Sequence, residues 1–158
     1  MILKNYLMVN GRSDGQTIAQ NTHIYNLPEG FQTSDVTDAG LTRLLIRQAY
    51  TALNLWARVI ANGVQANSTM TLQIGGVDTA LTVTFGAGVT GTMQDTTHTV
   101  GLGSGDSVNV DSFAGAGGTS IQLSLVAMQW QCAFDVSTIS GTGSTACSPS
   151  TTYYHPVI

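Results

Sequence analysis

Three glycines at the spacing G-x-G-x-x-G, Gly86, Gly88 and Gly91, are the first candidates for chemistry in this sequence. In dinucleotide-binding proteins such a turn leads from a strand into a helix, whose N-terminal amides bind the pyrophosphate. Here an alternating run, TALTVTF, precedes the turn, but the stretch that follows, TMQDTTHTVGLGSGDSV, has no apolar stripe at helical spacing. We therefore predict a β-hairpin turn at these glycines and no nucleotide or other cofactor.

The histidines and acids do not form a recognisable catalytic or metal-binding pattern. His23, His98 and His155 lie far apart in the sequence, and only His98 has an acid, Asp95, three residues away. Those two side chains could meet, but a metal site needs three or four donors. Glu29 is the single glutamate, the aspartates lie mostly at turn positions, and no G-x-S-x-G nucleophile motif is present. We expect neither a metal site nor an enzyme.

Two further pairs of residues invite comparison with known chemistry. Cys132 and Cys147 could bridge a loop of about 15 residues, which would stabilise the fold by ~3 kcal/mol in the chain-entropy model, or could remain separate thiols. Trp56 and Trp130 could form a platform that stacks on a sugar, although a strand tryptophan more often packs against a sheet or another subunit. The sequence leaves both alternatives open.

The elements that must position these residues are strands. Leu81, Val83 and Phe85 alternate with threonines, and similar runs with turn residues between them continue to residue 136. In the run 53–61 we expect the odd-numbered residues, from Leu53 to Ala61, to share one face. Short strands at this spacing are typical of a sandwich or barrel. Residues 39–63 also allow an amphipathic helix capped by Asp38, but the alternation favours two strands.

Composition excludes several classes of partner. Only 9% of the 158 residues are charged, the net charge is −4, and the five cationic residues are scattered. Nucleic-acid-binding proteins usually cluster their cations, so we expect no nucleic-acid partner. No apolar run reaches the ~18 residues that span a bilayer, and the N-terminal stretch is unlike a secretory signal. These features predict synthesis in a cytoplasm and no membrane partner.

Three segments between Asn54 and Val110 are similar to a known family: NLWARVIANG, STMTLQIGGVDTALTVTFGAGVTGTMQDTTHTV and GSGDSVNV. This region resembles the β-sandwich modules of tailed-bacteriophage virion proteins, which include capsid decoration (cement) proteins and head and tail fibre modules. The resemblance implies an all-β, jelly-roll-like antiparallel sandwich that is commonly trimeric and attaches to an assembled shell. The matching motifs are structural, so they indicate fold more strongly than role.

We therefore expect a capsid decoration protein on the exterior of a virion, made in the host cytoplasm. Its expected partners are further copies of itself, as a homotrimer, and a major capsid protein. A tail or fibre component that contacts the host, or a carbohydrate-binding module with a surface glycan as partner, are the alternatives. A fibre usually carries repeats or a coiled-coil stalk, and this sequence has neither.

We divide the chain into an N-terminal arm with the first strands (1–40), a sandwich core (41–136) and a C-terminal arm (137–158). Apolar ends fray in water unless a partner repays the entropy of ordering them. We expect both ends, together with the two tryptophans, to contact other chains. The candidate interface residues are Met1, Ile2, Leu3, Tyr6, Leu7, Trp56, Trp130, Tyr153, Tyr154, Val157 and Ile158.

Overall fold

The computed structural model describes the backbone of residues 2–12, 15–28, 30–31 and 36–135, and the side chains of 15–28 and 36–132. These residues form eleven strands and one 3-10 turn, and no helix among them is long and apolar enough to cross a membrane. In chain order the elements are β1 (Ile2–Arg12), β2 (Gln16–Ala19), β3 (His23–Asn26), β4 (Gly30–Phe31), η1 (Ala39–Thr42), β5 (Leu44–Leu45), β6 (Tyr50–Val64), β7 (Ser68–Ile74), β8 (Val77–Phe85), β9 (Gly91–Leu102), β10 (Ser107–Phe113) and β11 (Gly118–Asp135).

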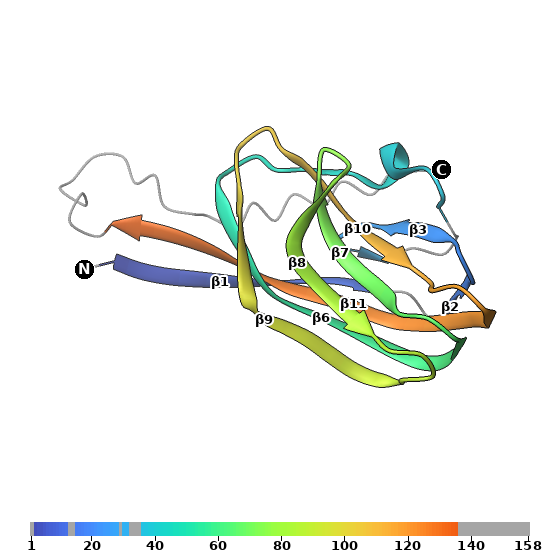
Figure 1. The fold of residues 1–158 in the computed structure, drawn as a ribbon. Coiled ribbons are helices and arrows are strands. Elements are labelled where there is room, and N and C mark those ends of the chain that lie inside the picture. Colours follow the sequence, from blue (N-terminus) through green and yellow to red (C-terminus); the bar gives the residue numbers. More distant parts are fainter. Residues whose placement is uncertain (1, 13–14, 29, 32–35, 136–158) are drawn as a thin grey trace.

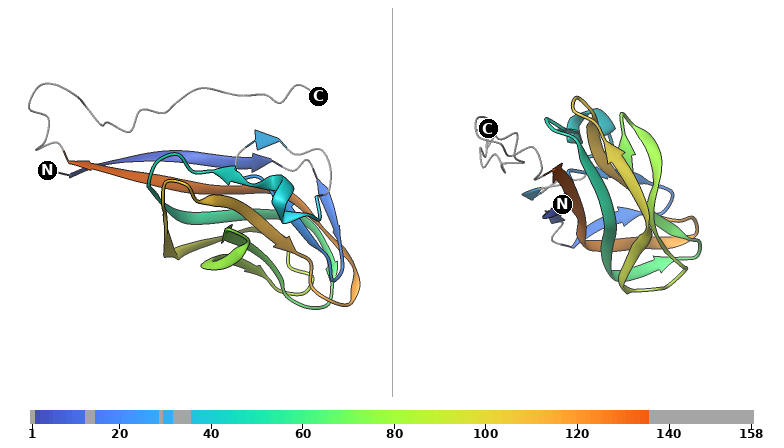
Figure 2. Two further views of the ribbon diagram at one scale, coloured as in Figure 1. Left: turned by 90° about the horizontal axis from the view of Figure 1, so that it is seen from above. Right: turned by 90° about the vertical axis from the view of Figure 1, so that its left-hand side faces the viewer.

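Two sheets pack face to face (Figures 1 and 2). Sheet A has the strand order β4-β1-β11-β6-β9, and β2 also pairs with β11. Sheet B has the order β3-β10-β7-β8, and β5 also pairs with β10. The long pairings are all antiparallel, and only the two-residue contact of β1 with β4 is parallel. The predicted all-β antiparallel sandwich is confirmed.

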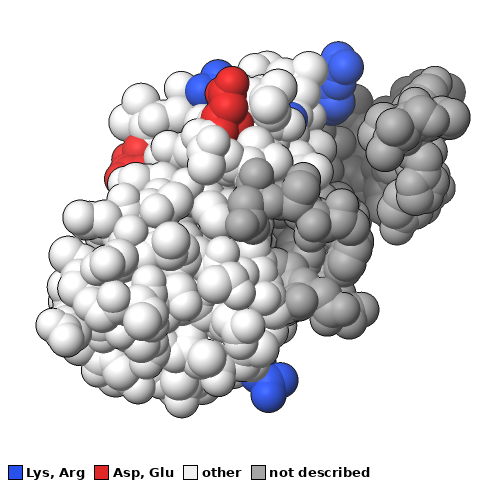
Figure 3. Space-filling model, turned by 90° about the vertical axis from the view of Figure 1, so that its right-hand side faces the viewer, with Lys and Arg blue, Asp and Glu red and all other residues white. Residues whose placement is uncertain are grey.

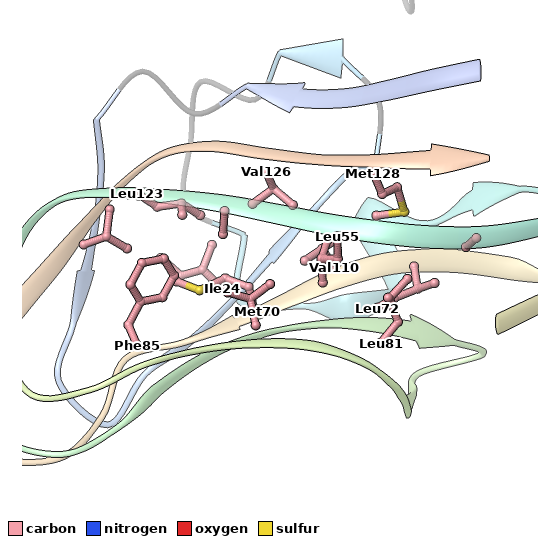
Figure 4. Close-up of a cluster of buried hydrophobic side chains, with 14 of the residues drawn as sticks. Ile24, Leu55, Met70, Leu72, Leu81, Phe85, Val110, Leu123, Val126 and Met128 are labelled. Atoms are coloured by element: carbon pink, nitrogen blue, oxygen red, sulfur yellow. The ribbon is translucent and has the colours of Figure 1, made fainter. Parts of the chain in front are cut away.

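The core lies between the sheets and is built by alternate residues of each strand (Figure 4). Leu81, Val83 and Phe85 of β8 are all buried, as their alternation predicts. Burying one such side chain fully contributes roughly 1.5–3 kcal/mol to folding. The largest fully buried side chains are Ile18, Ile24, Ile46, Leu55, Met70, Leu72, Leu81, Phe85, Leu102, Ile121, Leu123 and Met128.

The alternation in β6 is interrupted twice, which corrects part of the prediction. Leu55 faces the core, but Leu53 is only half-buried and Ala52 takes its place. Between them Asn54 has a φ of 50°, and the pairing of β6 with both neighbours shifts register there. Asparagine tolerates this left-handed conformation, and the extra residue of a bulge moves the side chains before it to the other face. A second register shift precedes Ala61, which is exposed.

The segment from 39 to 64 contains no α-helix. A single 3-10 turn, η1, is followed by the two-residue β5 and the long β6, so strands in place of a helix are confirmed, but the first strand is much shorter than the predicted run from Leu41 to Tyr50. Asp38 does act as a cap, because its Oδ1 accepts a hydrogen bond from the Gly40 amide at 2.8 Å. The cap serves one turn only.

The glycine-rich stretch is a turn between β8 and β9, and no helix follows it. The prediction of a turn is confirmed, but the turn does not close a hairpin, since β8 pairs with β7 in sheet B and β9 pairs with β6 in sheet A. The side-chain amide of Asn62 donates to the carbonyls of Gly86 (3.0 Å) and Val89 (2.9 Å). The turn is therefore fixed through its carbonyl groups, whereas an anion would need its amides.

At the other end of sheet A, β1 and β11 form a two-stranded ribbon that extends past the sandwich (Figure 1). β1 pairs with β11 along its length, whereas the register of β6 on β11 ends at Gln131. The backbone of residues 2–11 is thus paired within its own chain, and the expected contact of this stretch with another chain stays a prediction. Pairing with β11 supplies its hydrogen bonds.

Charge is sparse at the end of the sandwich where β6 meets β7 and β10 meets β11 (Figure 3). The connections 65–67, 86–90 and 114–117 at that end contain no lysine, arginine, aspartate or glutamate. A contact made by these connections would therefore depend little on salt.

Candidate functional site: a histidine and carboxylate cluster on sheet B

Four strands bring four polar side chains together on the outer face of sheet B. The strand register places Asp111 of β10 beside Tyr25 of β3, and Gln73 of β7 beside Asp78 of β8. Neighbouring residues such as Val110 and Leu72 face the core, so the polar residues between them point outward. We call His23, Gln73, Asp78 and Asp111 the histidine–carboxylate cluster.

A histidine–aspartate hydrogen bond is the centre of this cluster. Nδ1 of His23 lies 3.0 and 2.9 Å from the two carboxylate oxygens of Asp111. The side chain of Asp111 is 8% exposed, and that of His23 is 50% exposed. The carboxylate is therefore buried beneath an imidazole that reaches solvent. Because Nδ1 is engaged with Asp111, Nε2 is the ring nitrogen left for a ligand.

Gln73 connects the two carboxylates of the cluster. Its Nε2 donates to Oδ1 of Asp78 at 2.8 Å and lies 3.5 Å from Oδ2 of Asp111. Its Oε1 is buried and has no hydrogen-bond partner. A buried polar atom without a partner costs about 1–3 kcal/mol. The cluster is therefore built at a cost to folding.

The pKa values of the cluster show that Asp111 has few hydrogen-bond donors to stabilise its charge. Burial raises the pKa of Asp111, and the hydrogen bond and charge of His23 only partly oppose this rise, to which the charge of Asp78 adds. The pKa of Tyr25 is also raised, first by burial and then by the charges of Asp111, Asp78 and Asp38. Negative charge thus accumulates on this face.

Aromatic rings flank the imidazole. The ring centroid of His23 lies 4.6 Å from that of Phe113 and 6.5 Å from that of Tyr25. Threonine hydroxyls continue the face, where Thr71 and Thr82 are joined by a 2.7 Å hydrogen bond. Thr71 and Gln73 lie on the side of β7 opposite the core, and both are buried because neighbouring polar side chains bond to them.

A buried aspartate that orients a histidine is also part of hydrolase triads, which require a nucleophile on the second ring nitrogen. Among the described side chains, His23 makes no hydrogen bond with a serine, threonine or cysteine. The described residues likewise include no group of three metal-ligating side chains. The arrangement can orient a hydrogen-bonding ring toward a ligand.

A second histidine–aspartate pair lies on β9, where the sequence indicates that one could form. Nδ1 of His98 is 2.8 Å from Oδ2 of Asp95. Asp95 also accepts from the backbone amides of Thr97, His98 and Thr82, the last at 3.1 Å on the edge strand of sheet B. Burial raises the pKa of Asp95, but these hydrogen bonds outweigh it and hold the pKa well below its usual range. This pair links the edges of the two sheets.

The two tryptophans do not form one platform. Trp130 lies in the core at 4% exposure, with its ring 5.4 Å from that of Tyr50. Trp56 is half-buried on the outer face of sheet A, and its indole N–H donates to the side chain of Gln94. Of these two candidate interface residues, only Trp56 lies where another chain can contact it without rearrangement of the core.

The other predicted site residues lie partly or wholly outside the described side chains. Cys132 is disulfide-bonded and its Sγ accepts from Gln48 at 3.3 Å, while Cys147 lies outside the described residues, so the pairing of these two cysteines stays a prediction. The same holds for the interface role of both chain ends. The ends comprise Met1, Ile2, Leu3, Tyr6, Leu7, Tyr153, Tyr154, Val157 and Ile158.

Sequence reasoning missed the pairing of His23 with Asp111, which are 88 residues apart. The signal available was that each follows the alternation of a predicted strand and falls on its polar face. Which strands are neighbours is not encoded in that alternation.

Comparison with known protein families found no match for this chain, and comparison with characterised proteins found none similar.

Proposed function

We propose that the protein is a virion structural protein, a capsid decoration protein that binds and stabilises an assembled bacteriophage head. The observation that carries this proposal is the β1–β11 ribbon, which projects from a compact sandwich (Figure 1). Along Ile2–Asn10, the strands described next to β1 are limited to β11 on one side. A strand edge of this kind accepts a strand from a neighbouring chain through backbone hydrogen bonds.

The resemblance of residues 54–110 to virion sandwich modules supports the same role. These residues span most of β6 to β10, which supply three strands of sheet B (β7, β8 and β10) and two strands of sheet A (β6 and β9) but not the ribbon. The sandwich would act as the shared scaffold, and the ribbon would act as the contact particular to this chain. Many copies on one shell act together, so a modest contact per copy gives a tight coat.

Immunoelectron microscopy of virions from the phage that encodes the chain tests the proposal. We expect label distributed over the head. Label confined to the tail or its fibres would favour the alternative role as a tail or fibre component, and unlabelled particles would exclude both.

A binding experiment then tests the ribbon. Heads that lack the protein are mixed with the full chain, with a chain lacking residues 1–9, and with Val77→Ala as a control at an exposed side chain of sheet B. We expect co-sedimentation of the full chain and of Val77→Ala, and at least tenfold weaker binding of the deleted chain. Equal binding of the deleted chain, with the sandwich folded by circular dichroism, would show that the ribbon is not the attachment device.

A further inference from the structure

The histidine–carboxylate cluster presents hydrogen-bond acceptors to which no described residue donates. Oε1 of Gln73 is buried without a partner, and the exposed Asp78 accepts from Gln73 through only one carboxylate oxygen. With Nδ1 of His23 donating to Asp111, its Nε2 is an acceptor in the neutral ring. Asp78 and His23 come from the two outer strands of one sheet and both reach solvent, whereas Oε1 of Gln73 is closed to solvent, so the first two are the acceptors that a ligand can reach.

An apolar surface lies beside these acceptors. Phe113 is half-buried and its ring is tilted by 34° against the imidazole of His23. Partly exposed rings beside hydrogen-bonding side chains suit a ligand that has one apolar face and a polar rim. The hydroxyls of the adjacent threonines, including Thr69 and Thr84, add groups that both donate and accept.

Charge restricts the ligand further. The residues of the outer face that the register places around the cluster include no lysine or arginine, and the guanidinium of Arg43 lies at the end of the sheet, against the Gly75–Gly76 turn. The carboxylates of Asp78 and Asp111 repel an anionic ligand. A ligand that donates hydrogen bonds to these acceptors and carries no negative charge fits the face.

We infer that the outer face of sheet B, around His23, Asp78 and Phe113, binds a neutral saccharide. Sugar hydroxyls would donate to Asp78 and to Nε2 of His23, and the C–H face of a ring would pack on Phe113. This site is separate from the β1–β11 ribbon, which belongs to sheet A, and does not depend on the proposed attachment to a shell. It differs from the tryptophan platform that the sequence left open, which the burial of Trp130 excludes.

Titration of the ¹⁵N-labelled full chain, followed by amide chemical shifts, tests the inference. The neutral probes are hexamers of maltose, cellulose, mannose and chitin type, and the charged probes are hexagalacturonate and trilysine. We expect at least one neutral hexamer to shift the amides of 23–25, 71–73 and 111–113. We expect hexagalacturonate to leave these amides in place, and trilysine to bind more weakly than the active hexamer because it has no ring face to pack on Phe113.

Three variants locate the site. Asp78→Ala and Phe113→Ala should each weaken binding of the active hexamer about tenfold, the effect of losing one good contact. Trp56→Ala, on the other sheet, should leave the affinity unchanged. The inference is overturned if no neutral hexamer binds, if the shifts and the loss of affinity follow Trp56, or if hexagalacturonate or trilysine binds as tightly as the best neutral probe.

Discussion

The two histidine–aspartate pairs have nearly the same local geometry and opposite electrostatics. In each, Nδ1 of a half-exposed histidine lies within 3 Å of a carboxylate that is less than a tenth exposed. Asp95 also receives three backbone amides and the hydroxyl of Thr97, and its pKa is lowered. Among the described residues, Asp111 receives only His23 and a distant Gln73, and its pKa is raised. The number of donors, rather than the histidine, decides the direction.

This difference separates a structural role from a candidate functional one. Fully satisfied buried polar networks stabilise a fold, whereas partly satisfied networks cost stability. Natural proteins keep such costs mainly where a ligand or reaction uses the unsatisfied groups. The Asp95 pair therefore stabilises the sandwich edge, and the cluster around Asp111 is the better candidate for binding.

The difference in stability between the two pairs should be largest when each carboxylate is removed. Asp95→Ala leaves the amides of Thr82, Thr97 and His98 without their acceptor and should lower the free energy of unfolding by about 3 kcal/mol. Asp111→Ala should lower the free energy of unfolding by about 1 kcal/mol or less. The substitution removes a poorly solvated charge, which offsets the loss of the hydrogen bond from His23. Urea denaturation followed by circular dichroism measures both. Equal losses would contradict the distinction.

Lowering the pH should change the contributions of the two carboxylates to the free energy of unfolding in opposite directions. The pKa of Asp95 is lower in the folded state than its unfolded value of about 3.8, so its contribution is present above pH 4 and is lost as the pH falls below that value. The pKa of Asp111 is raised on folding, so the cost of its charge is relieved as the pH falls from neutral through that raised value.

Urea titrations between pH 7 and 3 test this expectation on the two amide variants. Asp95→Asn should lose part of the acid destabilisation seen in the unmodified chain, and Asp111→Asn should lose the small gain on mild acidification. Variants with the same pH profile as the unmodified chain would show that neither carboxylate is linked to folding.

Substitution of one donor in each network gives a smaller contrast. Thr97→Val removes the hydroxyl that donates to Oδ1 of Asp95 at 2.9 Å and should cost about 1 kcal/mol. Gln73→Leu removes an amide whose Oε1 is buried without a partner, and stability should stay unchanged or rise by up to about 1 kcal/mol. Thermal denaturation of both variants provides the measurement. A loss of stability in Gln73→Leu similar to that in Thr97→Val would argue that the cluster is structural.

The histidines themselves should matter least for stability. His98→Ala leaves Asp95 with four other donors and should cost about 0.5 kcal/mol. His23→Ala removes the main partner of Asp111 and should cost about 1 kcal/mol. The same denaturation assay ranks them, and the reverse order would contradict the difference in donor number.

Much of the fold could be predicted from local sequence, because alternation is a property of neighbouring residues. The strands that hold Leu81, Val83 and Phe85, and the long final strand, follow directly from it. The faces assigned to Leu53 and Ala61 were wrong, since bulges at and after Asn54 shift the alternation without a marked change in composition. The tertiary structure also placed β8 and β9 in different sheets and gave β1 a partner within its own chain.

For the candidate site, the sequence by itself determined that His23, Gln73 and Asp111 lie on polar faces of strands, and that Asp95 lies near His98. Contacts three residues apart follow from local geometry. A contact across 88 residues depends on which strands pair and in which register, and the free energy that selects this pairing comes from burying the whole core. Only the tertiary structure therefore brought His23 to Asp111 beside Phe113, and sent Trp130 into the core while Trp56 stayed outside.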